Sequence, residues 1–255
     1  MQKWQTSWNE DGEENSYGQV LYKRAVGELP EMESSKAAAR QLDGILKPTD
    51  RLADIGCAAG HYLRTLRSRF GADFDYLGVD ATPSYLALAQ KAFSTDPKAA
   101  FTEGNLYDLP FDDSSFDIAM CNNVLIHLPS VAVPLREIAR VAKRHAMIRM
   151  MVGQRTFLIR DVDAADDGFE LTDEGEPIGF QYFSIYSEAY VRAVLESSPG
   201  VKSVRIVPDE DFDPGMIQQA AQEYDQSKST TKVLGGKQIR DSVLCPWAFV
   251  HIEKE

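Results

Sequence analysis

Short apolar segments alternate with amphipathic segments along most of this chain. The apolar segments have the length and composition of buried strands, and they fall at 51–55, 76–80, 99–102, 116–121, 145–152, 201–207 and 247–252. Segments with apolar residues at helical spacing lie between them, among them 134–144 and 187–197. A further helix is predicted to begin with Thr82 as its cap and Pro83 in its first turn. This alternation predicts an α/β fold with a doubly wound, mainly parallel sheet.

The pattern also predicts how the chain is organised. Residues 1–46 precede the alternation, and 17–46 reads as helices broken near Gly27 to Pro30, so we expect an N-terminal helical cap. Residues 47–255 then form the main domain. Two segments depart from the alternation, at about 154–186 and 213–242, and are predicted to be insertions.

Composition and charge narrow the class of protein. At 255 residues, with a net charge of −12, the chain is predicted to be one acidic domain whose main partner is neither nucleic acid nor an anionic membrane. No apolar run approaches bilayer length, and the start of the chain has no signal-peptide core. Its three cysteines, Cys57, Cys121 and Cys245, lack metal-ligand spacing, so we expect free thiols in the cytoplasm and no metal site.

The segment 52–66, LADIGCAAGHYLRTL, is the most informative one. It reads as a strand that carries Asp54, then a turn of small residues from Gly56 to Gly60, then the start of a helix. Small residues at such a turn allow backbone N–H groups to approach a ligand closely. Twenty residues past Gly60 the next strand ends in Asp80, where an acid is placed to bind ribose hydroxyls. Together these features predict an adenosine-containing cofactor.

A third block, EGNLYDLPFDDSSFDIAMCNNVLIHL at 103–128, makes the interpretation more specific. Its Asn105, the Leu-Pro-Phe of 109–111, the Ser-Phe-Asp of 115–117 and the Leu-x-His-Leu of 125–128 follow the two acidic strand ends in order. In these motifs the chain resembles the class I S-adenosylmethionine-dependent methyltransferases of the small-molecule type, over roughly residues 40–150. The resemblance implies a seven-stranded sheet whose last strand is antiparallel and lies next to the sixth.

The resemblance also implies roles for individual residues. It implies S-adenosylmethionine as cofactor and S-adenosylhomocysteine as product, bound at the carboxyl ends of the first, second and fourth strands. The implied cofactor-binding residues are Asp54, Gly56, Cys57, Ala58, Gly60, Asp80, Ala81, Asn105, Leu106 and Asn122. Ala58 is a departure, because the family usually has glycine there. We expect one methyl group to be tolerated at that position if the backbone there is not at positive φ.

Methyl transfer from an activated donor needs alignment more than acid–base chemistry, so the lack of a catalytic triad is expected. His127 and Tyr17 are the candidates for a direct part in the reaction. A structural role is the simpler interpretation of His127, and Tyr17 either covers the site or packs on the domain. An acidic stretch at 161–176 either attracts a cationic or amine-bearing acceptor or forms a solvated loop.

The predicted function is methylation of an oxygen or nitrogen of a small molecule by a monomer or homodimer. A protein methyltransferase, a non-catalytic protein that binds S-adenosylmethionine, and a nicotinamide-dependent oxidoreductase remain open as alternatives. The G-x-G-x-x-G pattern of dinucleotide-binding proteins is absent, because three residues separate Gly56 from Gly60.

Overall fold

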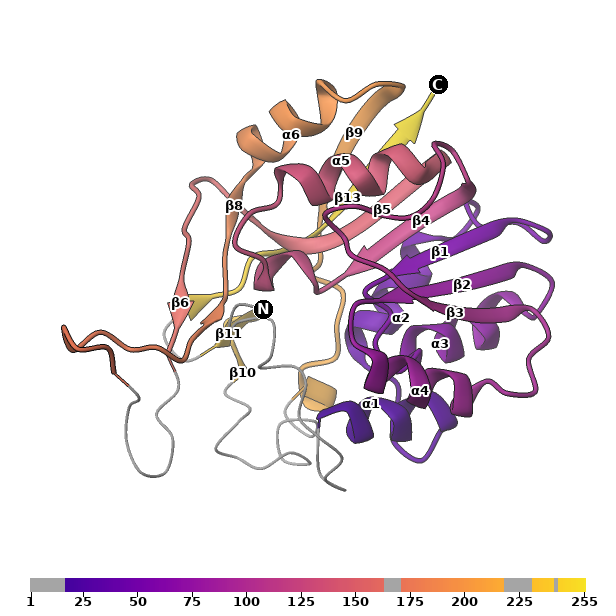
Figure 1. The fold of residues 1–255 in the computed structure, drawn as a ribbon, viewed down its shortest axis with the longest axis horizontal. Coiled ribbons are helices and arrows are strands. Elements are labelled where there is room, and N and C mark those ends of the chain that lie inside the picture. Colours follow the sequence, from indigo (N-terminus) through magenta and orange to yellow (C-terminus); the bar gives the residue numbers. More distant parts are fainter. Residues whose placement is uncertain (1–16, 163–170, 218–230, 241–242) are drawn as a thin grey trace.

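A seven-stranded sheet forms the centre of the molecule (Figure 1). The computed structural model describes residues 17–162, 171–217, 231–240 and 243–255. A short further strand, β8 (Tyr186–Ser187), pairs with the carboxyl end of β5. In their order across the sheet the seven strands are β3 (Ala99–Glu103), β2 (Asp75–Asp80), β1 (Arg51–Ile55), β4 (Phe116–Asn122), β5 (Ala142–Gly153), β13 (Trp247–Lys254) and β9 (Val201–Pro208).

The direction of the strands confirms the predicted architecture. Neighbouring strands from β3 to β5 run parallel. The last strand, β13, lies between β5 and β9 and is antiparallel to both. Because the parallel strands end at one edge, the loops after β1, β2, β4 and β5 meet there.

Helices cover both faces of the sheet (Figure 1). They are α1 (Tyr17–Val26), α2 (Glu33–Gln41), α3 (His61–Phe70), α4 (Pro83–Ala92), α5 (Ala132–Val141) and α6 (Glu188–Glu196), with a short 3-10 helix, η2 (Leu125–His127). The predicted break between α1 and α2 is present, and Gly27 supplies a left-handed residue there with φ of 89°. Ser187 caps α6, since its Oγ accepts a hydrogen bond from the Tyr190 N–H.

One predicted boundary is wrong. The helix expected over 134–144 ends at Val141, and β5 begins at Ala142 instead of at 145. Ala142 already pairs with Phe116 of β4. Extended backbone there also lets Arg144 reach the Asp50 carboxylate and the Ile45 carbonyl. These tertiary contacts outweigh the helical pattern of the sequence.

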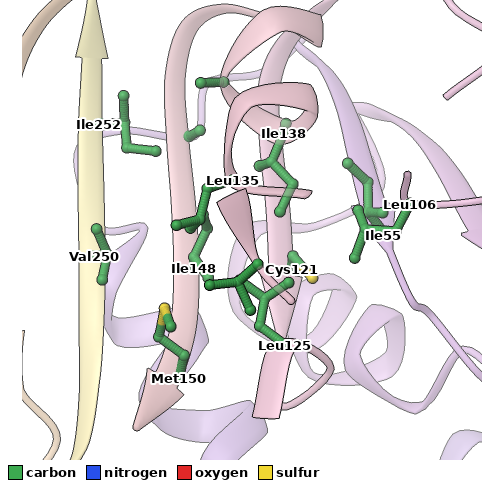
Figure 2. Packing of buried hydrophobic residues seen from close by; sticks show 14 of the residues in the cluster. Ile55, Leu106, Cys121, Leu125, Leu135, Ile138, Ile148, Met150, Val250 and Ile252 are labelled. Carbon is green, nitrogen blue, oxygen red and sulfur yellow. The ribbon is translucent and has the colours of Figure 1, made fainter. Parts of the chain in front are cut away.

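Two apolar clusters hold the helices on the sheet. On one face Leu135 and Ile138 of α5 pack towards Ile148 and Val250 of the sheet, as Figure 2 shows. On the other face Ala38 of α2, Leu42 directly after α2 and Leu63 of α3 are buried against the sheet, together with further residues of β1, β2 and β4. A sheet that is covered on both faces leaves only its edges and strand ends open to ligands.

The two segments that depart from the alternation form small sheets of their own. Within 154–186, β6 (Arg160–Asp161) pairs with β7 (Gln181–Tyr182). A second small sheet joins β10 (Thr231–Leu234), β11 (Lys237–Arg240) and β12 (Val243–Leu244). The remaining parts of the predicted cap and insertions, 1–16, 163–170, 218–230 and 241–242, lie outside the described residues. Among the helices described, none has the length and apolar character needed to cross a bilayer.

Candidate functional site

The loop between β1 and α3 turns through three left-handed residues. Gly56, Ala58 and Gly60 have φ of 81°, 47° and 77°. The N–H groups of Gly56 and Cys57 donate to the Val79 carbonyl at 2.7 and 3.1 Å, which ties the loop to β2. Ala58 therefore adopts the positive φ that glycine accommodates best, and it does so with a side chain.

The loop lies directly against the turn that follows β4. A Cβ atom added to Gly56 would overlap the side chain of Val124. Glycine is therefore required at position 56 for two reasons, since φ is positive and there is no space for a side chain.

Asp80, at the end of β2, reaches across to the same loop. Its carboxylate accepts hydrogen bonds from the Ala58 N–H at 2.8 Å and from the Thr82 N–H at 2.9 Å. Burial raises the pKa of Asp80, and these hydrogen bonds oppose that rise. Each carboxylate oxygen can accept more than one hydrogen bond, so the group can still bind a hydroxyl pair. Thr82 precedes α4 as predicted, without capping it through its side chain.

Asp54 is buried at the end of β1 and accepts a hydrogen bond from the Tyr76 hydroxyl at 2.7 Å. Burial raises the pKa of Asp54 to about 7, and the negative charge of Asp80 adds to the rise. A cationic ligand group beside Asp54 would favour its ionised form. The two acids therefore suit a ligand that carries both hydroxyls and a positive charge.

The side chain of Asn122, at the end of β4, has unsatisfied polar atoms. It is 6% exposed, and neither its Nδ2 nor its Oδ1 has a hydrogen-bond partner among the described residues. The pairing of Asp54 with Met120 puts Gly56 and Asn122 at the same level of the sheet. Buried amides normally have partners, so an unpartnered amide beside this loop indicates a ligand-binding position.

The other residues predicted to bind the cofactor lie around this edge. Ala81 is exposed after β2, and the buried Cys57 thiol lies in the loop. Asn105 is exposed and its Oδ1 accepts from the Tyr107 N–H at 3.0 Å, whereas Leu106 is buried. The structure thus brings the predicted residues of the β1, β2 and β4 ends together, with residues 105–106 following β3.

The two predicted catalytic candidates differ in their surroundings. His127 lies in η2, and its Nδ1 is 3.1 Å from the Tyr182 carbonyl oxygen, which can only accept, so Nδ1 carries the proton. Burial lowers the pKa of His127 to about 4, so the ring is neutral. Tyr17 is 41% exposed at the start of α1, a helix that packs on α3 and α4.

Sequence reasoning did not identify Arg149. This arginine is buried in the middle of β5, and its Nε donates to Asp209 Oδ2 at 2.7 Å. Its guanidinium group stacks on the Trp247 ring, 4.1 Å from the centroid. The available signal was a charged residue inside an otherwise apolar strand, Met147 to Val152, since a buried charge requires a specific partner.

A cavity of about 730 Å³ lies further along the same edge of the sheet, where β5, β9 and β13 meet the small sheet. Apolar side chains make up much of its wall, among them Phe212, Leu244 and Trp247. This volume is in the range of small-molecule sites. Within the residues described, no group of His, Cys, Asp and Glu side chains is arranged to hold a metal ion.

A left-handed loop, an acid after the second strand and an unpartnered amide after the fourth, all on one edge of a doubly wound sheet, define a nucleotide-type binding site of a Rossmann-like protein. Comparison with known proteins identifies the domain. Residues 53–150 match the family model described as a methyltransferase domain.

Two curated relatives illustrate the similarity. The chain is 32% identical over 103 residues to the 2-phytyl-1,4-naphtoquinone methyltransferase of Trichormus variabilis, covering 39% of this chain and 45% of that protein. It is 29% identical over 130 residues to the chloroplastic tocopherol O-methyltransferase of Arabidopsis thaliana, covering 49% of this chain and 35% of that protein. The chain thus matches less than half of the length of either relative.

Solved structures share the whole fold. The phosphoethanolamine N-methyltransferase 2 of Haemonchus contortus, solved with S-adenosyl-L-methionine, matches with a TM-score of 0.64 at 14% identity, over 100% of this chain and 60% of that chain. The chain therefore has the class I methyltransferase fold, and its residues 53–150 match a methyltransferase domain, as the motifs predict.

Proposed function

We propose that this protein transfers the methyl group of S-adenosylmethionine to an oxygen or nitrogen of a small-molecule acceptor. The observation that carries the proposal is the buried, unpartnered Asn122 amide beside the left-handed loop at Gly56. The methyltransferase-domain match over 53–150 covers both features.

The residues at this edge fit the cofactor by their chemistry. Asp80 would accept hydrogen bonds from the ribose hydroxyls while it holds the Ala58 and Thr82 N–H groups. Asn122 would bind the amino-acid part, and Asp54 would face the positive charge there. Asn105 and Leu106 would border the adenine, with Ala81 beside it.

When bound, the cofactor supplies a methyl group that is already activated for displacement. The chain then has to orient the acceptor in line with that methyl group and to exclude water. Buried residues of β4 and β5 pack on Leu135 and Ile138 of α5, and this packing holds the ends of the two strands in the fixed position that such alignment requires.

A small molecule is the acceptor class that the surroundings favour. The cavity near Trp247 and Phe212 is lined by none of the predicted cofactor-binding residues, but it has the size and a partly apolar wall for the body of such a molecule. The relatives named above are methyltransferases of a naphthoquinone, a tocopherol and phosphoethanolamine, all small molecules. Attraction of a cationic acceptor by 161–176 stays a prediction, as do the cytoplasmic location and the monomeric or homodimeric state.

His127 need not act as a base in this scheme. Its Nδ1–H donates to the Tyr182 carbonyl, which ties η2 to β7. We therefore expect His127→Ala to keep turnover within about tenfold of the native value, whereas a loss of a hundredfold or more would assign it a role as base. Initial rates of S-adenosylhomocysteine formation measure the difference.

The test of the function is turnover. Purified protein is incubated with S-adenosylmethionine and a panel of phenols, quinols and amines, and S-adenosylhomocysteine is quantified by mass spectrometry. Formation of a methylated small molecule, reduced in the Asp80→Ala variant at limiting S-adenosylmethionine, supports the proposal. Methylation of proteins alone would indicate a protein methyltransferase, and binding without turnover on any acceptor would indicate a non-catalytic binding protein.

A further inference from the structure

A chain of polar side chains, all buried except the half-buried Asn123, crosses the molecule behind the cofactor edge. It starts at Tyr62 in the first turn of α3, passes through Asn123 and Arg149, and ends at Asp209 after β9. Four segments that are distant in the sequence are therefore joined by hydrogen bonds. None of these residues carries a role in the proposed reaction.

Asn123 is the central member of this chain. Its backbone is left-handed, with φ of 64°, and its N–H donates to the Arg149 carbonyl at 3.0 Å. Its side-chain Oδ1 accepts from Arg149 Nη1, and its Nδ2 donates to the Tyr62 hydroxyl at 3.1 Å. Asparagine tolerates positive φ better than most residues, but a defined rotamer there needs partners on both sides.

Arg149 is itself held rigidly. Its side chain is 4% exposed, and Asp209, with a side chain 3% exposed, neutralises its charge through contacts of 2.6 and 2.7 Å. The Trp247 ring stacks on the guanidinium plane. With two nitrogens committed to Asp209, the third, Nη1, points to Asn123. The forked geometry of arginine allows both contacts at once, whereas the single ammonium group of lysine does not.

The position of Asn123 determines what happens at the site. The residue before it, Asn122, carries the unpartnered amide, and the residue after it, Val124, packs against Gly56 of the cofactor loop. A change in the backbone of Asn123 would thus move both a predicted cofactor contact and the support of the loop.

We propose that Arg149 is a positioning residue, which sets the Asn122 amide and the Gly56 loop for the cofactor by holding Asn123 in its left-handed conformation. The inference rests on the proposed function, since it concerns the same cofactor edge. Arg149 touches neither cofactor nor acceptor in this account, and it acts only through Asn123.

Three variants test the proposal by their affinity for S-adenosylhomocysteine in isothermal titration. Asn123→Gly keeps an easy left-handed backbone and the Arg149–Asp209 pair but removes both side-chain hydrogen bonds. Arg149→Lys keeps a charge for Asp209 but gives up the contact with Asn123. We expect each to weaken binding about tenfold, which corresponds to about 1.4 kcal/mol. The double variant should be no weaker than Asn123→Gly alone, because Arg149 acts through that residue.

The matched control is Arg144→Lys, which changes an arginine at the opposite end of β5 that bonds to Asp50 and Ile45. It should leave binding unchanged. Native-like affinity of Asn123→Gly, or losses that multiply in the double variant, would overturn the inference while the native protein still binds. If the native protein itself binds no S-adenosylhomocysteine, the proposed function fails first and the inference fails with it. Asn123→Gly leaves no buried charge without a partner, so the test holds even if Arg149→Lys does not fold.

Discussion

The two halves of the sheet edge are built in different ways. Around β1, β2 and β4 the site consists of backbone groups and small residues within 54–60, plus an acid and an amide at strand ends. Around β5, β9 and β13 it consists of large side chains that come from distant segments, such as Arg149, Asp209 and Trp247. Backbone groups and small residues suit a ligand that is always recognised in the same way. The side chains of the second half, by contrast, can be exchanged without a change of fold, which suits a specificity site.

The largest expected effect tests the first half directly. Gly56→Ala puts a side chain at a φ of 81°, where it overlaps the side chain of Val124. We expect the free energy of unfolding to fall by roughly 2–4 kcal/mol. We also expect no measurable binding of S-adenosylhomocysteine.

The matched control is Gly235→Ala, in the turn between β10 and β11 of the small sheet. It also has positive φ, of 58°, but no atom lies within 4 Å of the added Cβ. Urea unfolding of Gly235→Ala should show a loss of about 1–2 kcal/mol in the free energy of unfolding, and titration with S-adenosylhomocysteine should show native affinity. Equal losses of binding in the two variants would contradict the special role of the loop at Gly56.

Removal of the acid after β2 should give the next largest effect. Asp80→Ala removes the acceptor for the Ala58 N–H and the acceptor that we propose for the ribose hydroxyls, so binding of S-adenosylhomocysteine should weaken by roughly 1–3 kcal/mol. Isothermal titration measures the change. Asp211→Ala serves as control, because Asp211 pairs with Arg40 at the surface. Native affinity in Asp80→Ala would mean that the ribose contact is wrongly assigned.

The pH dependence of stability should have opposite signs at Asp54, on the cofactor edge, and at a buried histidine pair near the opposite end of β5. Burial raises the pKa of Asp54 from about 3.8 in the unfolded chain to about 7 in the folded protein. The protonated carboxyl group therefore contributes its full stability to the folded state below pH 3.8, and this stability is lost as the pH rises to about 7. Without ligand, Asp54→Asn should therefore gain stability relative to the native protein between pH 4 and 7 (order-of-magnitude limits from these two pKa values). Denaturant unfolding at the two ends of this range measures the gain, and a difference that does not change with pH would contradict it.

The buried histidine pair of β5 and β13 gives the opposite sign. His145 Nε2 lies 3.1 Å from His251 Nδ1, and burial lowers the pKa of His145 to about 4. A lowered histidine pKa contributes stability above about 6.5, the unfolded value, and that stability is lost as pH falls through the folded value. His145→Asn should thus gain stability relative to the native protein below about pH 6.5. Denaturant unfolding of both proteins, extended to acid pH, measures this gain. A difference in the free energy of unfolding that does not change with pH would show that the pKa of His145 is not lowered in the folded protein.

The smallest effect concerns the residue that departs from the family pattern. Ala58→Gly relieves a side chain at a φ of 47°, which costs roughly 1–2 kcal/mol, but it adds about 0.5–1 kcal/mol of backbone entropy to the unfolded chain. We expect a net gain between about 0 and 1.5 kcal/mol and slightly tighter S-adenosylhomocysteine binding. Thermal unfolding with and without ligand measures both, and a loss of stability would show that the side chain of Ala58 makes a favourable contact.

The first half of the site was predictable from sequence because backbone recognition constrains residue type and spacing. The turn at 56–60 tolerates only small residues, and parallel strand ends place Asp54, Asp80 and Asn122 on one edge wherever the strands are recognised. The strands themselves were recognisable because a sheet covered on both faces needs continuous apolar segments.

The second half of the site was not predictable from sequence, because it depends on contacts between side chains that lie far apart in the chain. The partner of Arg149 lies 60 residues further along the chain, and the start of β5 at Ala142 depends on pairing with β4 and on Asp50. Local periodicity contains neither fact. The cavity lined by Phe212 and Trp247 likewise arises only from segments that the fold brings together.

The central claim is that the edge formed by the β1, β2 and β4 ends binds S-adenosylmethionine. Parallel titrations of the native protein with S-adenosylhomocysteine and with NADH test it most directly, with the melting temperature as a second readout. We predict saturable binding of S-adenosylhomocysteine at one site per chain, with a raised melting temperature and no response to NADH. Binding of NADH without binding of S-adenosylhomocysteine would contradict it.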